Sequence, residues 1–353
     1  MTPGLRVMTP GLMTTLQDLG RPGYQRLGVP VSGALDQVSF RAANLLVGNA
    51  EGVGALEIAY QGPTLSVEAD SVRIAVTGGL APIDVLPRNG QGSASRRLAP
   101  CQSARLVRGE VLKIGALLGS AVAYLAVEGG FAIAPVLGSQ STLTRAGIGG
   151  VQGRALKAAD VLPLKQAAAA ERDEAVLPSI DLAPPKRVRI VVGPQDDHFT
   201  PASLRKLLAS SYFVSPACDR MGMRLVGPPL EHSSKGYDIV SDGIALGSIQ
   251  VPGNGLPIIL LADRQTTGGY SKIATVISAD IPSLGRLTPG ARIAFAAVSI
   301  EAAEAAARQL ASDIAAMAAS ITPVPHSSVI DPKRLMVENL VSGVVSARGG
   351  GEA

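Results

Sequence analysis

The chain has 353 residues and a mass of 36.0 kDa, so at roughly 150 residues per domain it is long enough for about two domains with hydrophobic cores. Charged residues make up only 17%, the net charge is +4, and no run of Lys and Arg concentrates positive charge, which disfavours nucleic-acid binding. The 40 glycines and 25 prolines indicate many turns between short strands and disfavour an all-helical architecture.

The N-terminal segment and the cysteines indicate the cellular compartment in which the protein is expected. Residues 1–12 contain no apolar stretch typical of a secretory signal. Cys101 and Cys218 lie in neither a CxxC nor a zinc-ligand spacing, which suits a reducing environment. An uncharged stretch at 243–262 has the length of a membrane span, but it contains Pro252 and Pro257 and is expected to form strand, loop and strand. We therefore expect a cytoplasmic protein without disulfides.

The first part of the chain is expected to contain many strands and one helix. Asp36 is placed to cap a helix over residues 37–47, and Gly48 would end it. Segments rich in β-branched residues predict strands at 72–77, 104–107 and 122–127. We assign residues 1–165 to an N-terminal domain.

A change of composition predicts a linker over residues 166–187, where an alanine run leads into charged residues and then into prolines. After it, Thr200 and Ser299 are expected to begin two helices. Similar β-branched segments predict strands at 188–192, 258–261, 273–277 and 293–298. The second domain is predicted over residues 188–323, followed by a tail over 324–353.

The two β-rich halves are similar in size and share a Gly-Pro-x-Leu segment, at 62–65 and at 227–230. A sheet that closes on itself has no exposed edges. The similarity therefore favours two related barrels.

Common signatures of nucleotide, zinc, dinucleotide and serine-esterase sites are absent from the sequence. The three histidines, His198, His232 and His326, lie far apart, and each is more often a surface or capping residue than a metal ligand. We predict no metal site.

Polar residues gather instead among glycines in four blocks, at 14–24, 218–225, 247–257 and 261–272. Guanidinium and carboxamide groups form paired hydrogen bonds with planar groups that offer both donors and acceptors, so these blocks are candidates for binding such a group. A structural alternative stays open: Asp18 would pair with Arg21, Asp36 would only cap its helix, and Asp–Arg bridges would hold loops together.

Several blocks resemble the KipA family, also called the family of the 5-oxoprolinase C component or of the second allophanate hydrolase component, which is similar to half of the carboxyltransferase part of urea amidolyase. The resemblance runs from about Val7 to Val298. The blocks that carry it are Gln17-Asp18-Leu19-Gly20-Arg21, Gly28-Val29-Pro30, Ser32-Gly33-Ala34, Ala43-Asn44-Leu45-Leu46-Val47-Gly48-Asn49, Gly138-Ser139-Gln140-Ser141-Thr142, Asp219-Arg220-Met221-Gly222, Ile249-Gln250-Val251-Pro252 and Ala262-Asp263-Arg264-Gln265-Thr266-Thr267-Gly268-Gly269-Tyr270.

The resemblance implies a mainly β fold with a few helices, in two tandem cyclophilin-like β-barrel domains. It implies the C component of a 5-oxoprolinase complex that uses ATP to open 5-oxoproline to glutamate, together with a KipI-like partner and a LamB/YcsF-like partner. The ATP site is not assigned to this chain, and the isolated chain is expected to be inactive. One alternative is a regulatory or assembly module that binds a KipI-like protein. Another is a biotin-dependent carboxyltransferase acting on urea or a similar amide, and only this alternative requires biotin.

The expected site residues come from both halves. We predict that Asp219, Arg220, Asp263 and Arg264 are catalytic, and that substrate is bound by Arg224, Gln250, Gln265, Thr266, Tyr270, Gln17, Asp18 and Arg21. The arginines would neutralise a carboxylate or a developing oxyanion, the glutamines would bind the amide edge, and an aspartate would orient an arginine or accept a proton. Cys218 stands where the family usually has Ser, and a thiol is the weaker donor.

Overall fold

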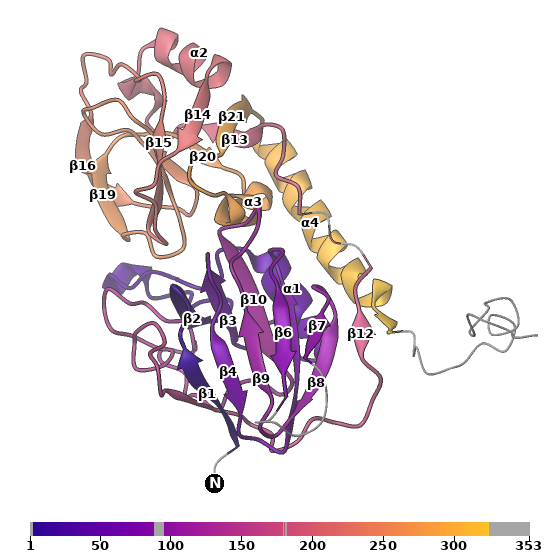
Figure 1. Ribbon diagram of the computed structural model, residues 1–353. Coiled ribbons are helices and arrows are strands. Elements are labelled where there is room, and N and C mark those ends of the chain that lie inside the picture. The colour runs from indigo at the N-terminus through magenta and orange to yellow at the C-terminus, as the bar shows by residue number, and fades with distance from the viewer. Residues whose placement is uncertain (1–2, 88–94, 179, 181, 325–353) are drawn as a thin grey trace, which may run out of the picture.

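A computed structural model describes residues 3–87, 95–178, 180 and 182–324 of the chain. Within these ranges the chain is mainly β with four α-helices, and a C-terminal barrel lies at one end of a pair of N-terminal sheets (Figure 1). No helix in the described ranges combines the length and the apolar character needed to cross a membrane.

The N-terminal half forms two antiparallel sheets around one core. One sheet has the strand order β11-β1-β4-β9-β6-β7 and the other has β2-β3-β10-β5-β8. Their bounds are β1 Gly4–Thr9, β2 Met13–Gln17, β3 Ala55–Ala59, β4 Thr64–Val67, β5 Ser71–Thr77, β6 Ile83–Leu86, β7 Arg96–Leu98, β8 Ser103–Val107, β9 Val111–Ile114, β10 Val122–Val127 and β11 Val161–Pro163.

Strand β5 is buried along its whole length because both of its faces are covered. Ile74 and Val76 point into the core between the two sheets. Ala75 points to the opposite face, where it packs in a second cluster with helix α1, Gln37–Leu46. The alternation of side chains along a strand explains this division.

Helix α1 begins where the sequence predicts and ends at Leu46, one residue before the predicted end. The Asp36 carboxylate accepts hydrogen bonds from the amides of Val38 (3.1 Å) and Ser39 (3.2 Å), and Gly48 follows the helix at φ +75°. An aspartate at the N-cap satisfies amides that have no partner within the helix, and a glycine adopts the left-handed conformation without a steric penalty.

The C-terminal half is a closed barrel of seven strands in the order β13-β20-β17-β18-β15-β14-β21. Closure results from the parallel pairing of β21 with β13. The bounds are β13 Val188–Val192, β14 Ser211–Val214, β15 Gly222–Val226, β17 Ser248–Gln250, β18 Ile258–Leu260, β20 Lys272–Val276 and β21 Arg292–Ala297; β16 Asp238–Gly243 and β19 Thr267–Tyr270 form a separate two-stranded ribbon. The expected mainly β fold is confirmed, with the first β unit present as two packed sheets.

Three further helices belong to the C-terminal half: α2 Pro201–Ala209, α3 Ile281–Arg286 and α4 Ile300–Ser320. Thr200 and Ser299 cap α2 and α4 as expected, by accepting hydrogen bonds from the amides of Ser203 and Ala302. Helix α3 and the 3-10 turns Gln25–Leu27, Asp196–His198 and Ser278–Asp280 were not predicted from the sequence.

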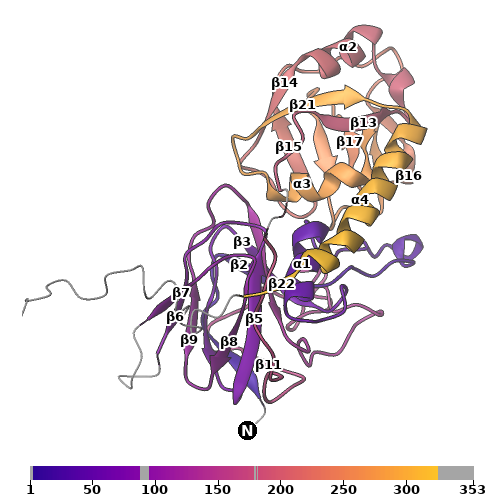
Figure 2. The same cartoon turned by 90° about the vertical axis from the view of Figure 1, so that its right-hand side faces the viewer.

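Helix α4 runs along the side of the molecule from the barrel to the N-terminal sheets (Figure 2). Met317 packs there against the cluster around α1. The expected linker is partly structured, since β12 (Ala175–Val176) lies within it and pairs with β22 (Thr322–Pro323). The domain boundaries stay a prediction, and residues 325–353 of the expected tail, with His326, lie outside the described residues.

Candidate functional site

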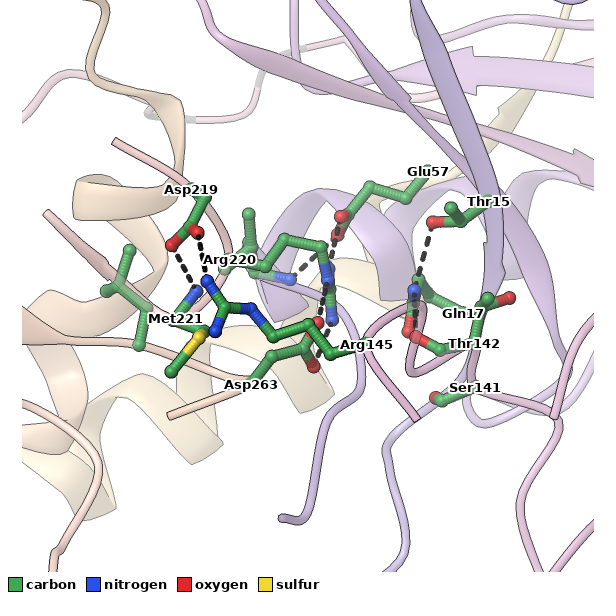
Figure 3. A network of polar contacts seen from close by, with 12 residues as sticks. Thr15, Gln17, Glu57, Ser141, Thr142, Arg145, Asp219, Arg220, Met221 and Asp263 are labelled. Carbon is green, nitrogen blue, oxygen red and sulfur yellow. Dashed lines mark hydrogen bonds and ion pairs between the residues drawn. The ribbon is translucent and has the colours of Figure 1, made fainter. Parts of the chain in front are cut away.

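Arg220 joins the two halves of the molecule (Figure 3). It lies in the loop before β15, and its Nε donates to Asp263 Oδ2 (2.8 Å) just after β18. Its Nη1 donates to Glu57 Oε1 on β3, and its Nη2 donates to the carbonyl of Gly33 (2.6 Å). All three nitrogens of the guanidinium are therefore occupied, so Arg220 and Asp263 hold loops together, as the structural alternative expected.

The charges around Arg220 are balanced within the protein. Burial by itself lowers the pKa of Arg220, but the carboxylates of Glu57 and Asp263 outweigh it, and the pKa is raised well above its usual value. Tyr124 donates its hydroxyl hydrogen to Glu57 (2.7 Å). Burial, followed by the negative charges of Glu57 and Asp36, raises the pKa of Tyr124. The arginine is therefore cationic and the tyrosine neutral at ordinary pH.

A second buried ion pair also connects the halves. Arg286 on α3 donates from Nη1 to Asp36 Oδ2 (2.6 Å), while Asp36 caps α1 through its other oxygen. The capping role expected for Asp36 is confirmed, and its pairing with a residue 250 positions away was not predicted.

A cavity of about 530 Å³ collects five of the predicted site residues. It lies on the outer face of the barrel over β15, β18 and β17, and the predicted residues in its lining are Asp219, Arg224, Gln250, Gln265 and Tyr270. Its volume falls within the range of about 300–1,000 Å³ that is usual for small-molecule sites.

Strand register explains why these side chains meet. Arg224 on β15 and Gln250 on β17 both pair with Ile258 of β18. Their inward neighbours Met223 and Ile249 belong to the barrel core, so the side chains of Arg224 and Gln250 project from the opposite face.

The two carboxamide side chains of the cavity are hydrogen-bonded to each other. Gln265 Nε2 donates to Gln250 Oε1 (3.2 Å), and Gln250 Nε2 donates to the carbonyl of Tyr270 (3.3 Å). A Cβ at Gly268 would lie 2.6 Å from Ile244 Cδ1 and 2.7 Å from Gln250 Nε2, so a larger residue there would displace these side chains. The arrangement places an amide donor and an amide acceptor next to each other.

Arginines supply the positive charge of this cavity. Arg224 is exposed and forms no ion pair with a described residue. Arg145, from the N-terminal half, lies 3.5 Å from Asp219, whose other oxygen accepts from the amides of Met221 and Gly222. Arg145 was not among the predicted residues, although it follows the quoted block at 138–142 by only three positions.

The three predicted residues of the N-terminal block do not line this cavity. Gln17 donates to Thr142 O (3.1 Å), and Asp18 accepts from Ser139 Oγ (2.6 Å), so both hold the segment 138–142. Arg21 donates to a backbone carbonyl of the same segment, and in the described part of the chain it forms no ion pair with Asp18. Burial lowers the pKa of Arg21, and this effect outweighs the negative charges of Asp18 and Asp263, which raise it. Contact of these residues with substrate stays a prediction.

Asp263, Arg264 and Thr266 also lie outside the lining of this cavity. Arg264 is buried and faces a different cavity, between α1, α3 and α4. The backbone carbonyl of Thr266 accepts from the amide of Ile244 (3.1 Å). Cys218 lies at the cavity wall, where burial raises the pKa of its thiol and Sγ donates to Ser215 O (2.9 Å). The catalytic roles expected for Asp219, Arg220, Asp263 and Arg264 stay predictions.

Comparison with known proteins agrees with this architecture. Residues 27–297 match the family model described as carboxyltransferase domain, subdomain A and B. The chain is 37% identical to the C component of 5-oxoprolinase from Escherichia coli over 300 residues, which cover 85% of this chain and 93% of that protein. It is also 37% identical to the C component of 5-oxoprolinase from Haemophilus influenzae over 292 residues, covering 82% of this chain and 89% of that protein.

A solved structure, that of urea amidolyase from K. lactis, superposes with a TM-score of 0.80 at 29% identity. The superposition covers 90% of this chain but only 20% of the urea amidolyase chain. The similarity to the larger enzyme is therefore a similarity to one part of it.

Proposed function

Because the chain belongs to the family of carboxyltransferase domains, subdomains A and B, we propose that it is the C component of an ATP-dependent 5-oxoprolinase complex in the cytoplasm. The complex would cleave 5-oxoproline to glutamate with a KipI-like partner and a LamB/YcsF-like partner. The observation that carries the proposal is the similarity to two proteins named as this component of 5-oxoprolinase along nearly their whole length.

The cavity over β15, β17 and β18 suits the chemistry of 5-oxoproline. This molecule is a lactam, in which an N–H donor and a carbonyl acceptor lie side by side, and it also carries a carboxylate. The joined carboxamides of Gln250 and Gln265 offer the complementary acceptor and donor. The guanidinium of Arg224, which forms no ion pair with a described residue, offers a partner for the carboxylate.

The chain would contribute orientation and charge stabilisation to the reaction. Amide resonance makes the lactam carbon a poor electrophile. Phosphorylation of the carbonyl oxygen by ATP would make this carbon more electrophilic. Arg224 and Arg145 would stabilise negative charge on the substrate, and Tyr270 would close the cavity from the ribbon side. Arg220 and Asp263 would act as positioning residues, because their interactions hold the loop that carries Asp219.

The test is reconstitution of the complex. The chain is purified with its KipI-like and LamB/YcsF-like partners, and ATP hydrolysis is measured with and without 5-oxoproline. We expect stimulation only when all three proteins are present. Gln265→Ala should lower kcat/KM for 5-oxoproline by about tenfold, because one or two hydrogen bonds to the lactam are lost.

A matched control is Gln309→Ala. Gln309 lies on the exposed face of α4 and bonds to Asp313 of the same helix (2.8 Å), so the turnover of this variant should equal that of the wild-type complex. Turnover of Gln265→Ala equal to that of the control would contradict the assignment of the cavity. Complex formation without any 5-oxoproline-stimulated turnover would favour the regulatory role.

Carboxyl transfer to urea or a similar amide is a second candidate, favoured by the superposition on urea amidolyase. The same two carboxamides fit the planar ureido ring of biotin, which is also an N–C=O unit. The two activities differ in their requirements, because only carboxyl transfer needs a biotinylated carrier protein. Inhibition by avidin would identify the second candidate, and full activity in its presence would favour the first.

A further inference from the structure

A second cavity, of about 440 Å³, lies where the two halves of the molecule meet. Helices α1, α3 and α4 come together at this junction (Figure 2). Most of the lining is aliphatic, with Leu246, Ile281 and Leu310 on different elements. Its polar members are Ser32, Gln37, Arg41, Arg264 and Ser278. It is distinct from the cavity over β15, β17 and β18, with which it shares no lining residue.

Arg264 brings a positive charge into this apolar cavity. The residue is 5% exposed, and its guanidinium donates to two backbone carbonyls, those of Ile244 (3.1 Å) and Leu261 (3.4 Å). In the described part of the chain no carboxylate forms an ion pair with it. Burial lowers the pKa of Arg264.

The other arginine in the lining differs in this respect. Arg41 pairs with Glu51 at 2.6 Å, so its charge is already compensated. An ion that is buried without a partner is costly, and an anion bound beside Arg264 would remove that cost. Arg264 is therefore the arginine of this lining whose positive charge one bound anion would compensate.

Ser32 adds an unsatisfied hydrogen-bonding group to the same wall. The residue is 6% exposed, and the buried Oγ has no hydrogen-bond partner among the described residues. The amide of Ser32 donates to the carbonyl of Ala262 (3.2 Å), which places the serine beside the segment that carries Arg264. A buried hydroxyl without a partner is uncommon in proteins and calls for an explanation.

We propose that this cavity binds a small organic monoanion, in which a carboxylate contacts Arg264 and Ser32 and an aliphatic body packs among Leu246, Ile281 and Leu310. A guanidinium and a hydroxyl are matched donors for the two oxygens of a carboxylate. The single uncompensated cation favours one negative charge over the two of a phosphate monoester. The aliphatic walls favour a carboxylate with a hydrocarbon body over a bare inorganic ion.

The test is calorimetric titration of the full-length chain with three probes: isovalerate, its neutral analogue isovaleramide, and inorganic phosphate. We expect isovalerate to bind and the amide to bind at least about tenfold more weakly, because the amide lacks the charge. Phosphate should bind more weakly than isovalerate as well. Equal affinities for isovalerate and isovaleramide, tighter binding of phosphate, or no binding of isovalerate would overturn the proposal.

Variants locate the binding. Arg264→Met should weaken isovalerate binding by at least about tenfold, and Arg224→Met, the same substitution in the other cavity, should leave it unchanged. Ser32→Ala removes a hydroxyl that has no partner in the described part of the chain, so the variant should fold normally and bind isovalerate several-fold more weakly. Wild-type affinity in both Arg264→Met and Ser32→Ala, or loss of binding in Arg224→Met, would refute the assignment.

Discussion

Substitution of Arg220 by methionine tests the physical basis of the contact between the two halves. The change removes the hydrogen bonds to Asp263 Oδ2 (2.8 Å) and to Gly33 O (2.6 Å), together with the ion pair to Glu57. Methionine fills much of the same volume but leaves two carboxylates buried, with side-chain exposures of 4% for Glu57 and 5% for Asp263.

The magnitude follows from the cost of uncompensated charge. Removal of one partner from a buried ion pair typically costs about 3–5 kcal/mol, because the remaining charge loses its compensation. At an unfolding entropy of about 2.1 cal/mol/K per residue, this loss should lower Tm by about 4–7 °C in a chain of 353 residues. Replacement of the whole network by neutral groups, with Glu57→Gln and Asp263→Asn added to Arg220→Met, should recover a large part of the loss.

Differential scanning calorimetry at neutral pH measures these effects. Arg224→Met is the control, because Arg224 is exposed and forms no ion pair with a described residue. We expect its Tm to stay within about 1 °C of the wild-type value. An Arg220→Met variant as stable as this control, or a triple variant less stable than Arg220→Met, would refute the reasoning.

Two further predictions concern local features. Thr200→Ala removes the N-cap acceptor of the Ser203 amide (3.1 Å) and should cost about 1 kcal/mol, which urea denaturation can measure; an unchanged midpoint would contradict the capping role. The side-chain hydrogen bonds from Arg154 lower the pKa of Asp160. Because the folded pKa lies below the unfolded value, the ionised carboxylate stabilises the fold above the unfolded pKa of about 3.9, and this stabilisation is lost as the pH falls. The Tm difference between wild type and Asp160→Asn should therefore shrink on acidification, and a difference independent of pH would argue against the linkage.

The sequence predicted best those features that depend on neighbours along the chain. Helix α1 and the strands β10 and β13 lie where residue type and spacing placed them. Capping needs only an acceptor a few residues from the amides it satisfies, so Asp36 and Thr200 could be identified without a fold. The short helix α3 was missed, because six residues containing Pro282 and Gly285 carry little helical signal.

For the candidate site, the sequence identified the polar blocks but not their grouping. Gln250, Gln265 and Arg224 could be selected as candidates because unusual polar residues among glycines stand out. Their meeting in one cavity depends on the pairing of β15 and β17 with β18. The separation of Arg264 into another cavity depends on how the loop after β18 turns, which residue types alone do not specify.

The sequence by itself determined a β-rich chain in two halves, the ends of its main helices and the family to which it is similar. These features follow from local conformational preference and from long matching blocks. Only the tertiary structure decided which charges are compensated: Arg220 is paired with Glu57, 163 residues away, whereas Arg264, only one residue beyond Asp263, is left without a carboxylate partner among the described residues. The energy of a charge depends on its burial and on groups within a few ångströms, and both are set by contacts between distant segments.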